Sequence, residues 1–177
     1  MMISAYIVSQ ILVGIAAVFD VLSFQFRDRK RILACLAVSS ALIAGHFFLI
    51  GNVTAGLCTI LSATRFTVAY FSKRRSWIWV FSLVATLVLV STYQSPINLL
   101  PFLGAILGAI GSFHGSDKVL RLCAMVGTAG WIIHNMLIGS PAAVALESLF
   151  LACNVFGFWR FYLRGTYSAL DGRTGEQ

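Results

Sequence analysis

The sequence is a succession of apolar runs, each about as long as a helix that crosses a bilayer. A spanning helix needs about 20 mostly apolar residues, because the hydrocarbon core of a membrane is about 30 Å thick. Short polar or basic segments separate the runs, and little sequence lies outside them. We therefore predict seven transmembrane helices, over residues 3–26, 32–50, 53–71, 77–93, 97–113, 119–138 and 142–163.

Composition supports an all-α, polytopic membrane protein whose main partner is the lipid bilayer. Of 177 residues, 59% are hydrophobic and 11% are charged, whereas soluble domains carry about 25% charged residues. The net charge of +7 does not indicate nucleic-acid binding, because the basic residues form short clusters between apolar runs. The four cysteines lie inside apolar runs without C-x-x-C spacing, so we interpret them as packing residues and expect no metal and no cofactor.

The basic residues also predict an orientation. With seven helices, the segments after the first, third and fifth helices share one side of the membrane with the C-terminal tail. Every Lys and Arg except Arg65 falls in or beside those segments. The positive-inside rule therefore predicts that the N-terminus is outside and the C-terminus is in the cytoplasm. The N-terminal run has no basic residue before it, so no cleaved signal peptide is expected.

Two stretches of the chain match each other at a constant shift of 88 residues, the separation of His46 and His134. They cover 27–51 and 115–139, and each ends in H-x-x-L-I-G. Apolar composition alone would give about two or three identities, and the alignment has more, so we infer an internal repeat. The identical positions in the first copy are 30, 35, 38, 41, 46, 49, 50 and 51.

The repeat predicts two similar halves. The first three helices correspond to the last three, and the helix between them restores the direction of the second copy, as in a parallel repeat about an axis along the membrane normal. Solute sites in such proteins commonly lie where the halves meet. The expected units are a three-helix bundle at 1–75, a connector helix at 76–94, a second three-helix bundle at 95–164 and a cytoplasmic tail at 165–177.

Several motifs carry a family resemblance that spans nearly the whole chain. They are SFQFRDRKR at 23–31, HFFLIG at 46–51, WIIHNMLIGS at 131–140, and the spacing of Glu147 and Asn154. With these motifs the chain resembles the YgjV-type bacterial inner-membrane proteins. Its helix plan is also similar to that of the SWEET and PQ-loop transporters and of the PnuC-type nicotinamide-riboside transporters. The resemblance implies a SWEET-like fold in the bacterial inner membrane, and implies fold more than substrate.

Asp20 and Arg65 are the sharpest pair of candidate site residues. An ionised side chain deep in a span costs about 2.5–3.5 kcal/mol, so each should face protein or water and be paired. They lie about 10 and 12 Å from the same end of their helices, at 1.5 Å per residue. The repeat partner of Asp20 is Gly108, within a stripe of small residues that marks close packing, so Asp20 should face the bundle interior. The interpretations are a buried ion pair that fixes two helices together, an anion-binding or gating pair, or an Arg65 that snorkels to the surface.

His46, His134 and Glu147 form a second group, at similar depth near the opposite ends of their helices. We expect Glu147 and His134 to share a polar pocket, with His46 in the equivalent place of the first half. Histidine changes charge near neutral pH, so this group is suited to relaying or sensing protons. The alternatives are that both histidines bond helix ends across the bundle, or that two His and one Glu bind a metal without a spacing signature.

Asn154 and Trp131 complete the candidate solute-binding residues. Asn154 lies two helical turns after Glu147, and the SWEET-like resemblance implies that a third-helix Asn touches the solute. Its counterpart in the first half is Arg65, if the alignment is shifted by one residue. Trp131 lies one turn before His134, where it would stack on a solute or anchor the helix at the membrane interface.

These observations predict a transporter or facilitator for a small polar solute, working by alternating access between two three-helix bundles. The alternative is a non-transporting scaffold or accessory protein, and either allows a homo-oligomer. An enzyme is not expected, because no nucleophile–base pair or metal motif stands out. A transporter should have a polar cavity between the halves, lined by the residues Asp20, Arg65, Glu147 and Asn154. A scaffold should have these groups sealed in pairs.

Overall fold

The protein is helical throughout the part that the computed structural model describes, which is residues 2–26, 29–159 and 162. The expected all-α class is confirmed for these residues. The predicted tail at 165–177 lies outside them, as do the last residues expected for the seventh helix. The elements are α1 Met2–Gln25, α2 Arg29–Leu49, α3 Val53–Phe71, α4 Trp77–Thr92, the 3₁₀ helix η1 Pro96–Asn98, α5 Leu99–Phe113, α6 Asp117–Leu137 and α7 Pro141–Phe158.

The two copies of L-I-G form the turns that end α2 and α6. Gly51 and Gly139 have φ values of 76° and 70°, a left-handed conformation that glycine adopts without steric cost. The backbone N–H of Asn52 donates to the Phe47 carbonyl at 2.9 Å, and that of Ser140 donates to the Asn135 carbonyl at 3.0 Å. This is the Schellman arrangement, in which the residue after the glycine bonds back into the last turn. The repeated motif is therefore a helix stop, and it places Asn52 and Ser140 at the starts of α3 and α7.

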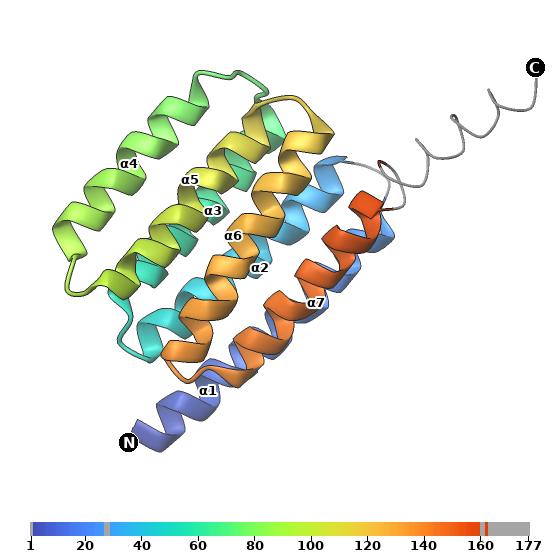
Figure 1. The fold of residues 1–177 in the computed structure, drawn as a ribbon. Helices are drawn as coiled ribbons and strands as arrows, with labels where there is room; N and C mark the ends of the chain where they lie inside the picture. Colours follow the sequence, from blue (N-terminus) through green and yellow to red (C-terminus); the bar gives the residue numbers. More distant parts are fainter. Residues whose placement is uncertain (1, 27–28, 160–161, 163–177) are drawn as a thin grey trace, which may run out of the picture.

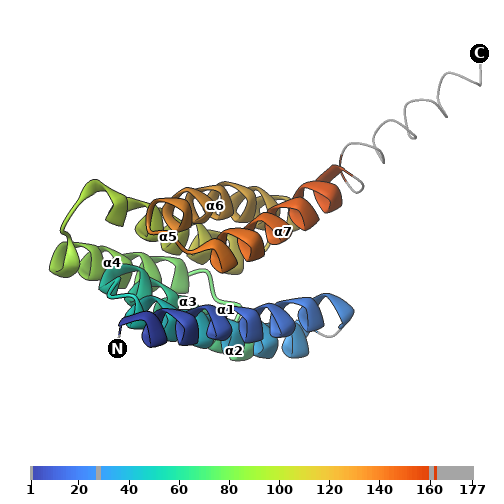
Figure 2. The same cartoon turned by 90° about the horizontal axis from the view of Figure 1, so that it is seen from below.

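The helices form two layers that pack face to face. Figure 2 shows α1, α2 and α3 in one layer and α5, α6 and α7 in the other. Within each layer α2 and α6 lie in the middle, between the two helices that they contact. Between the layers, α3 packs on α5 and α1 packs on α7, while α4 packs along the outside of α3 and α5 (Figure 1). The space between α2 and α6 is thus bounded on two sides by helices that meet across the layers. We call these two contacts seams: the α3–α5 seam and the α1–α7 seam.

The two seams are packed differently. Buried clusters follow the α3–α5 seam over its length, one around Cys58 and Ala105 and another around Ala69 and Phe113, and α4 contributes to both. On the α1–α7 seam the buried cluster is Val13, Ala143 and Leu146, toward the end where α7 begins. We call this end of the molecule, where α2 and α6 finish, the histidine end, and the opposite end the basic end.

The outer surface of the bundle is apolar, as expected for a chain in a bilayer. Large side chains such as Ile11 on α1, Trp79 on α4 and Met136 on α6 are exposed. Among the described residues, four segments are long and apolar enough to cross a membrane, and α4 is a shorter apolar helix. The four are Ser4–Ser23, Lys30–Leu49, Pro96–Phe113 and Pro141–Phe158.

Candidate functional site

A cavity of about 290 Å³ lies between the two layers. Six helices contribute to its lining, α1, α2 and α3 from one layer and α5, α6 and α7 from the other. No residue of α4 is among those that line it. Five of the predicted site residues line this one cavity: Asp20, Arg65, Trp131, Glu147 and Asn154.

One side of the cavity is acidic, and we call it the acidic wall: Asp20 of α1 with Glu147 and Asn154 of α7. Asp20 is 8% exposed and lines the cavity together with Ser39. Asp20 and Glu147 line the same cavity, and within the described chain no salt bridge to a basic residue neutralises either. Asn154 donates its amide N–H to the Phe150 carbonyl at 3.0 Å. Its own carbonyl oxygen is left as an acceptor, so this wall attracts cations and hydrogen-bond donors.

The opposite side is basic, and we call it the basic wall: Arg65 of α3 with Gly108 and Ser112 of α5. The guanidinium of Arg65 donates to the Gly108 carbonyl at 2.9 Å and to the Ser112 hydroxyl. It also lies over the ring of Phe66, 4.3 Å from its centroid. Gly108 makes room for it, since a Cβ atom there would stand 2.9 to 3.3 Å from three guanidinium atoms. Arg65 is 8% exposed and is held by neutral groups, so its charge has no carboxylate partner among the described residues.

The expected ion pair between Asp20 and Arg65 does not form. The reason is the order of helices within the layer: α2 separates α1 from α3, so the two charges reach the cavity from opposite seams. Asp20 faces α7 across one seam, and Arg65 faces α5 across the other. The expectation that both residues point into the bundle holds, but each has its neighbours in the other layer.

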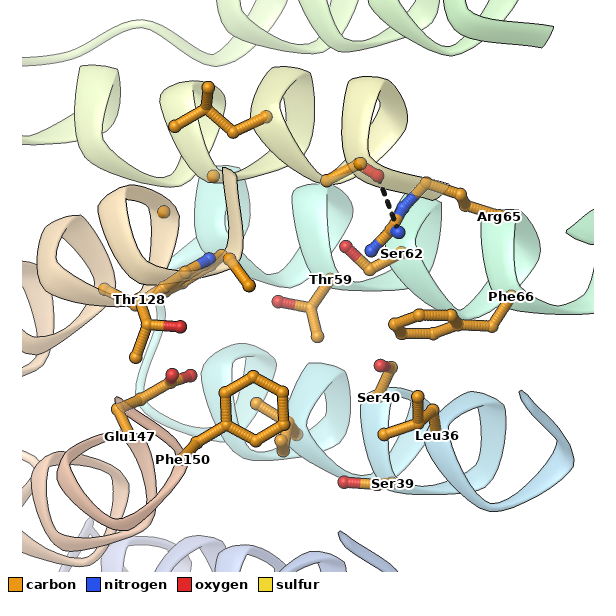
Figure 3. A pocket seen from close by; sticks show the side chains of 18 of the residues that line it. Leu36, Ser39, Ser40, Thr59, Ser62, Arg65, Phe66, Thr128, Glu147 and Phe150 are labelled. Carbon is orange, nitrogen blue, oxygen red and sulfur yellow. Dashed lines mark hydrogen bonds between the residues drawn. The ribbon is translucent and has the colours of Figure 1, made fainter. Parts of the chain in front are cut away.

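Hydroxyl groups occupy the space between the two walls. Figure 3 shows Glu147 across the cavity from Arg65, with Thr59 and Ser62 between them. Thr59 donates to the Ala55 carbonyl at 2.7 Å and Ser62 to the Cys58 carbonyl at 3.1 Å, so their oxygens stay available as acceptors. Sequence reasoning missed these hydroxyls, because Ser and Thr are common in membrane helices. Others in the lining are Ser39, Ser40 and Thr128.

His46 and His134, which were also expected among the solute-binding residues, lie at the histidine end and do not line the cavity. Both side chains are 0% exposed. The Nδ1–H of His46 donates to the Ser9 carbonyl at 3.2 Å, and its Nε2 accepts from the Ser140 hydroxyl at 3.1 Å. Ser140 is the N-cap residue of α7, in the other layer. His46 therefore bonds a helix end across the bundle, which is one of the interpretations that the sequence allowed.

His134 makes the reciprocal contact. The side-chain carbonyl of Asn52 caps α3 by accepting the Ala55 N–H at 3.1 Å, so its NH₂ group is left to donate to His134 Nε2 at 3.0 Å. His134 therefore carries its proton on Nδ1, which faces the Asn135 side-chain oxygen at 3.4 Å. The expected pocket shared by His134 and Glu147 is not formed, because the histidine turns toward α3. Each histidine thus bonds the N-cap residue of the third helix in the opposite layer, and we call these two contacts the histidine latch.

An aromatic layer separates the cavity from the latch. Trp131 stacks on Phe47 with ring centroids 5.4 Å apart and planes 25° apart, and it meets His134 edge-on at 5.5 Å. Phe47 is 1% exposed and also contacts His46, at 4.9 Å. The Trp131 indole fits because Gly104 has no side chain, since a Cβ atom there would collide with the indole nitrogen. The cavity is therefore closed by aromatic rings toward the histidine end.

Comparison with known proteins gives a consistent match over most of the chain. The family Imp-YgjV, described as bacterial inner membrane protein, matches residues 7–165. One relative, the inner membrane protein YgjV of Escherichia coli strain K12, is 32% identical over 182 aligned residues, which cover 96% of this chain and 99% of the relative. No solved structure matches the chain.

Proposed function

This chain belongs to the Imp-YgjV family of bacterial inner membrane proteins, and from that premise we propose that it is a transporter or facilitator for a small polar solute. The observation that carries the proposal is the polar cavity between the two layers. Buried charges are costly in a membrane protein and usually mark the path of a solute or ion. Here Asp20, Arg65 and Glu147 face one space, instead of being sealed against each other as a scaffold would require.

The proposed architecture is seven spans in two three-helix halves, with α4 as the connector. It is supported by the cavity lining, in which many residues occur as pairs 88 positions apart, one from each layer. These pairs are 20 and 108, 36 and 124, 39 and 127, 40 and 128, 43 and 131, 59 and 147, 62 and 150, and 66 and 154. Asn154 corresponds to Phe66 without any shift, and not to Arg65. Such pairs arise if the cavity lies on a two-fold axis between the halves, where transporters with parallel repeats hold their solutes.

The proposed transport cycle is alternating access, with the histidine end closed. Hydrogen bonds between the layers gather at that end of the α1–α7 seam: Tyr6 to the Gly139 carbonyl at 2.9 Å, and the Ala142 N–H to Gln10 at 3.3 Å. Toward the basic end the cavity extends past Glu147 to Asn154. By the positive-inside rule, the proposed orientation puts the N-terminus outside and the basic end in the cytoplasm. The cavity would then be closed toward the outside.

The proposal is tested by flux through a blocked cavity. Ser62 lines the cavity from α3, and its hydroxyl bonds only its own helix, so Ser62→Ala should leave the cavity open and Ser62→Phe should fill it. Proteoliposomes of each variant are loaded with a pooled extract of small polar bacterial metabolites and diluted, and the retained solutes are measured by mass spectrometry. We expect one or a few solutes to leave vesicles with the native protein or Ser62→Ala, and to remain with Ser62→Phe. Equal retention of every solute in all three would favour the scaffold.

A further inference from the structure

We propose that the solute of this cavity is a small zwitterion, with its cationic group at the acidic wall and its anionic group at Arg65. This inference rests on the proposed function, since it names the chemistry of the solute that would be carried. Its basis is the separation of unlike charges across one cavity: Asp20 and Glu147 enter from the α1–α7 seam, and Arg65 enters from the α3–α5 seam.

The protein itself leaves these charges uncompensated. Arg65 is more than nine-tenths buried, and its Nη1 donates to a neutral carbonyl and a neutral hydroxyl. A guanidinium has five N–H donors, so its Nε and Nη2 sides keep donors for an anion. Asp20 is equally buried, and no described Lys or Arg forms a salt bridge with it. Burying a charge without a partner costs several kcal/mol, so this arrangement favours a ligand that supplies a counter-charge to both walls.

A zwitterion supplies a counter-charge to both walls, whereas a solute with one charge or none does not. A monocation would pair with Asp20 and Glu147 and leave Arg65 alone, whereas a monoanion would do the reverse. An uncharged solute would bond the hydroxyls of Thr59 and Ser62 but would leave both walls without a counter-charge. A site built to bond a particular group rejects analogues that lack it, because its own buried polar groups are then unpaired.

The size and shape of the cavity limit the solute further. Ligand pockets span about 300–1,000 Å³, so a cavity of about 290 Å³ is at the small end of the range. Figure 3 shows the side chains of Leu36 and Phe66 near the basic wall and Phe150 near the acidic wall, with hydroxyls between them. This mixed lining suits a short hydrocarbon or polar spacer between an ammonium and a carboxylate. We therefore expect a compound of amino-acid size, and not a large or polyanionic one.

Thermal stabilisation of the purified full-length protein in detergent tests the inference. The probes are the zwitterions glycine, β-alanine, γ-aminobutyrate and δ-aminovalerate, with propylamine, butylamine, propionate and butyrate as partners that carry one charge. A ligand that binds only the folded state raises the unfolding temperature by an amount that grows with the ratio of its concentration to its Kd. We expect β-alanine, γ-aminobutyrate or another of the zwitterions to stabilise the protein at about 10 mM, a concentration that detects millimolar affinity, and the amines and carboxylates, which match β-alanine and γ-aminobutyrate in length, to have no effect. If none of the zwitterions raises the unfolding temperature, the inference is wrong. It is also wrong if an amine or a carboxylate raises the unfolding temperature more than the zwitterions do.

Variants of the two walls supply the second arm. Glu147→Gln and Arg65→Gln should each weaken binding of the best zwitterion by about thirtyfold or more, the expected loss when one partner of a buried charge pair is removed. Arg65→Gln should also bring the zwitterion and the matching amine to equal affinity. Because Arg65 also holds α3 to α5, Asp20→Asn is the second variant should Arg65→Gln fail to fold. Ser148→Ala, next to Glu147 on the exposed face of α7, is the matched control and should bind normally. Unchanged zwitterion affinity in Glu147→Gln and Asp20→Asn would refute the site.

Flux of the same compounds into proteoliposomes separates this inference from the proposed function. Binding of a zwitterion without flux would keep the site and remove the transport role. If an uncharged or singly charged solute is transported, and Glu147→Gln does not change its flux, the transport function stands and the inference of a zwitterionic solute is wrong. Saturable flux of a zwitterion that Glu147→Gln reduces would support both.

Discussion

The histidine latch gives a prediction in which two similar contacts have different energetic consequences. His46 bonds Ser140 and His134 bonds Asn52, at 3.1 and 3.0 Å. The serine makes no capping bond to its own helix, whereas Asn52 also caps α3 through the Ala55 N–H. Ser140→Ala therefore removes one contact, and Asn52→Ala removes a contact and a cap.

The expected losses in the free energy of unfolding follow from the bonds that each substitution removes. Loss of a buried hydrogen-bond partner costs about 1 kcal/mol, and membrane interhelical bonds measured by double-mutant cycles average about 0.6 kcal/mol with a maximum near 1.7. Loss of an N-cap adds about 1 kcal/mol. We expect Ser140→Ala to lower the free energy of unfolding by about 1 kcal/mol and Asn52→Ala to lower it by about 2 kcal/mol. At about 2–4 °C per kcal/mol for a chain of this size, Asn52→Ala should lower the unfolding temperature by about 4–8 °C.

The assay is thermal unfolding in detergent, followed by tryptophan fluorescence. Asn52→Asp is the diagnostic control, because an aspartate keeps the cap acceptor and removes the amide that donates to His134. It should therefore behave like Ser140→Ala. The reasoning is refuted if Ser140→Ala costs as much as Asn52→Ala, or if Asn52→Asp is as damaging as Asn52→Ala.

Two further predictions concern topology and packing. Single cysteines at Gln94 and Ser116, in a background without the native cysteines, should react with impermeant thiol reagents from outside and from the cytoplasm respectively, and reaction of both from one side would exclude a membrane-spanning α5. Gly104→Ala should shift the fluorescence component that Trp131→Phe removes, because a Cβ atom at 104 would collide with the indole. Gly127→Ala should not shift it, since its Cβ would meet only ordinary contacts at 3.8 Å, and equal shifts in both variants would contradict this packing.

The features that depend on one helix could be predicted from the sequence. Helix ends follow from local signals, such as the glycine of each L-I-G motif, which takes a left-handed conformation and stops its helix. The direction in which a charge points follows from the cost of exposing it to lipid, and Asp20, Arg65 and Glu147 all face the cavity as expected. These inferences need only the periodicity of a helix and the chemistry of the bilayer.

The features that depend on neighbouring helices could not be predicted in the same way. Equal depth made Asp20 and Arg65 look like partners, but depth does not give the order of helices within a layer, and α2 lies between them. The same limit applies to His134 of α6, which was expected to face Glu147 of α7 but bonds Asn52 at the start of α3. Partner assignment requires knowing which helices share a seam, and a single sequence without contacts does not encode that in its local pattern.

The proposed two-fold repeat is kept at the histidine end and broken in the cavity. His46 and His134 are equivalent, as are their partners Ser140 and Asn52, and both contacts form. Each seam also has a bond between equivalent positions: the Ala142 N–H donates to the Gln10 side-chain oxygen, and the Asn98 side-chain amide donates to the Thr54 hydroxyl. A closure made of two like halves needs each half to separate in the same way, so matching contacts are expected there.

Within the cavity the equivalent positions differ in charge. The counterpart of Asp20 is Gly108, and that of Glu147 is Thr59. With exact two-fold symmetry, each seam would carry a pair of acids. The α1–α7 seam does, but the α3–α5 seam has Gly108 and Thr59 instead, and the guanidinium of Arg65 lies against Gly108. The helix positions around the cavity are equivalent, but their side chains make it negative on one side and positive on the other. A solute with two unlike charges would be held in one direction by such a cavity, while the symmetric closure above it would open evenly around the solute.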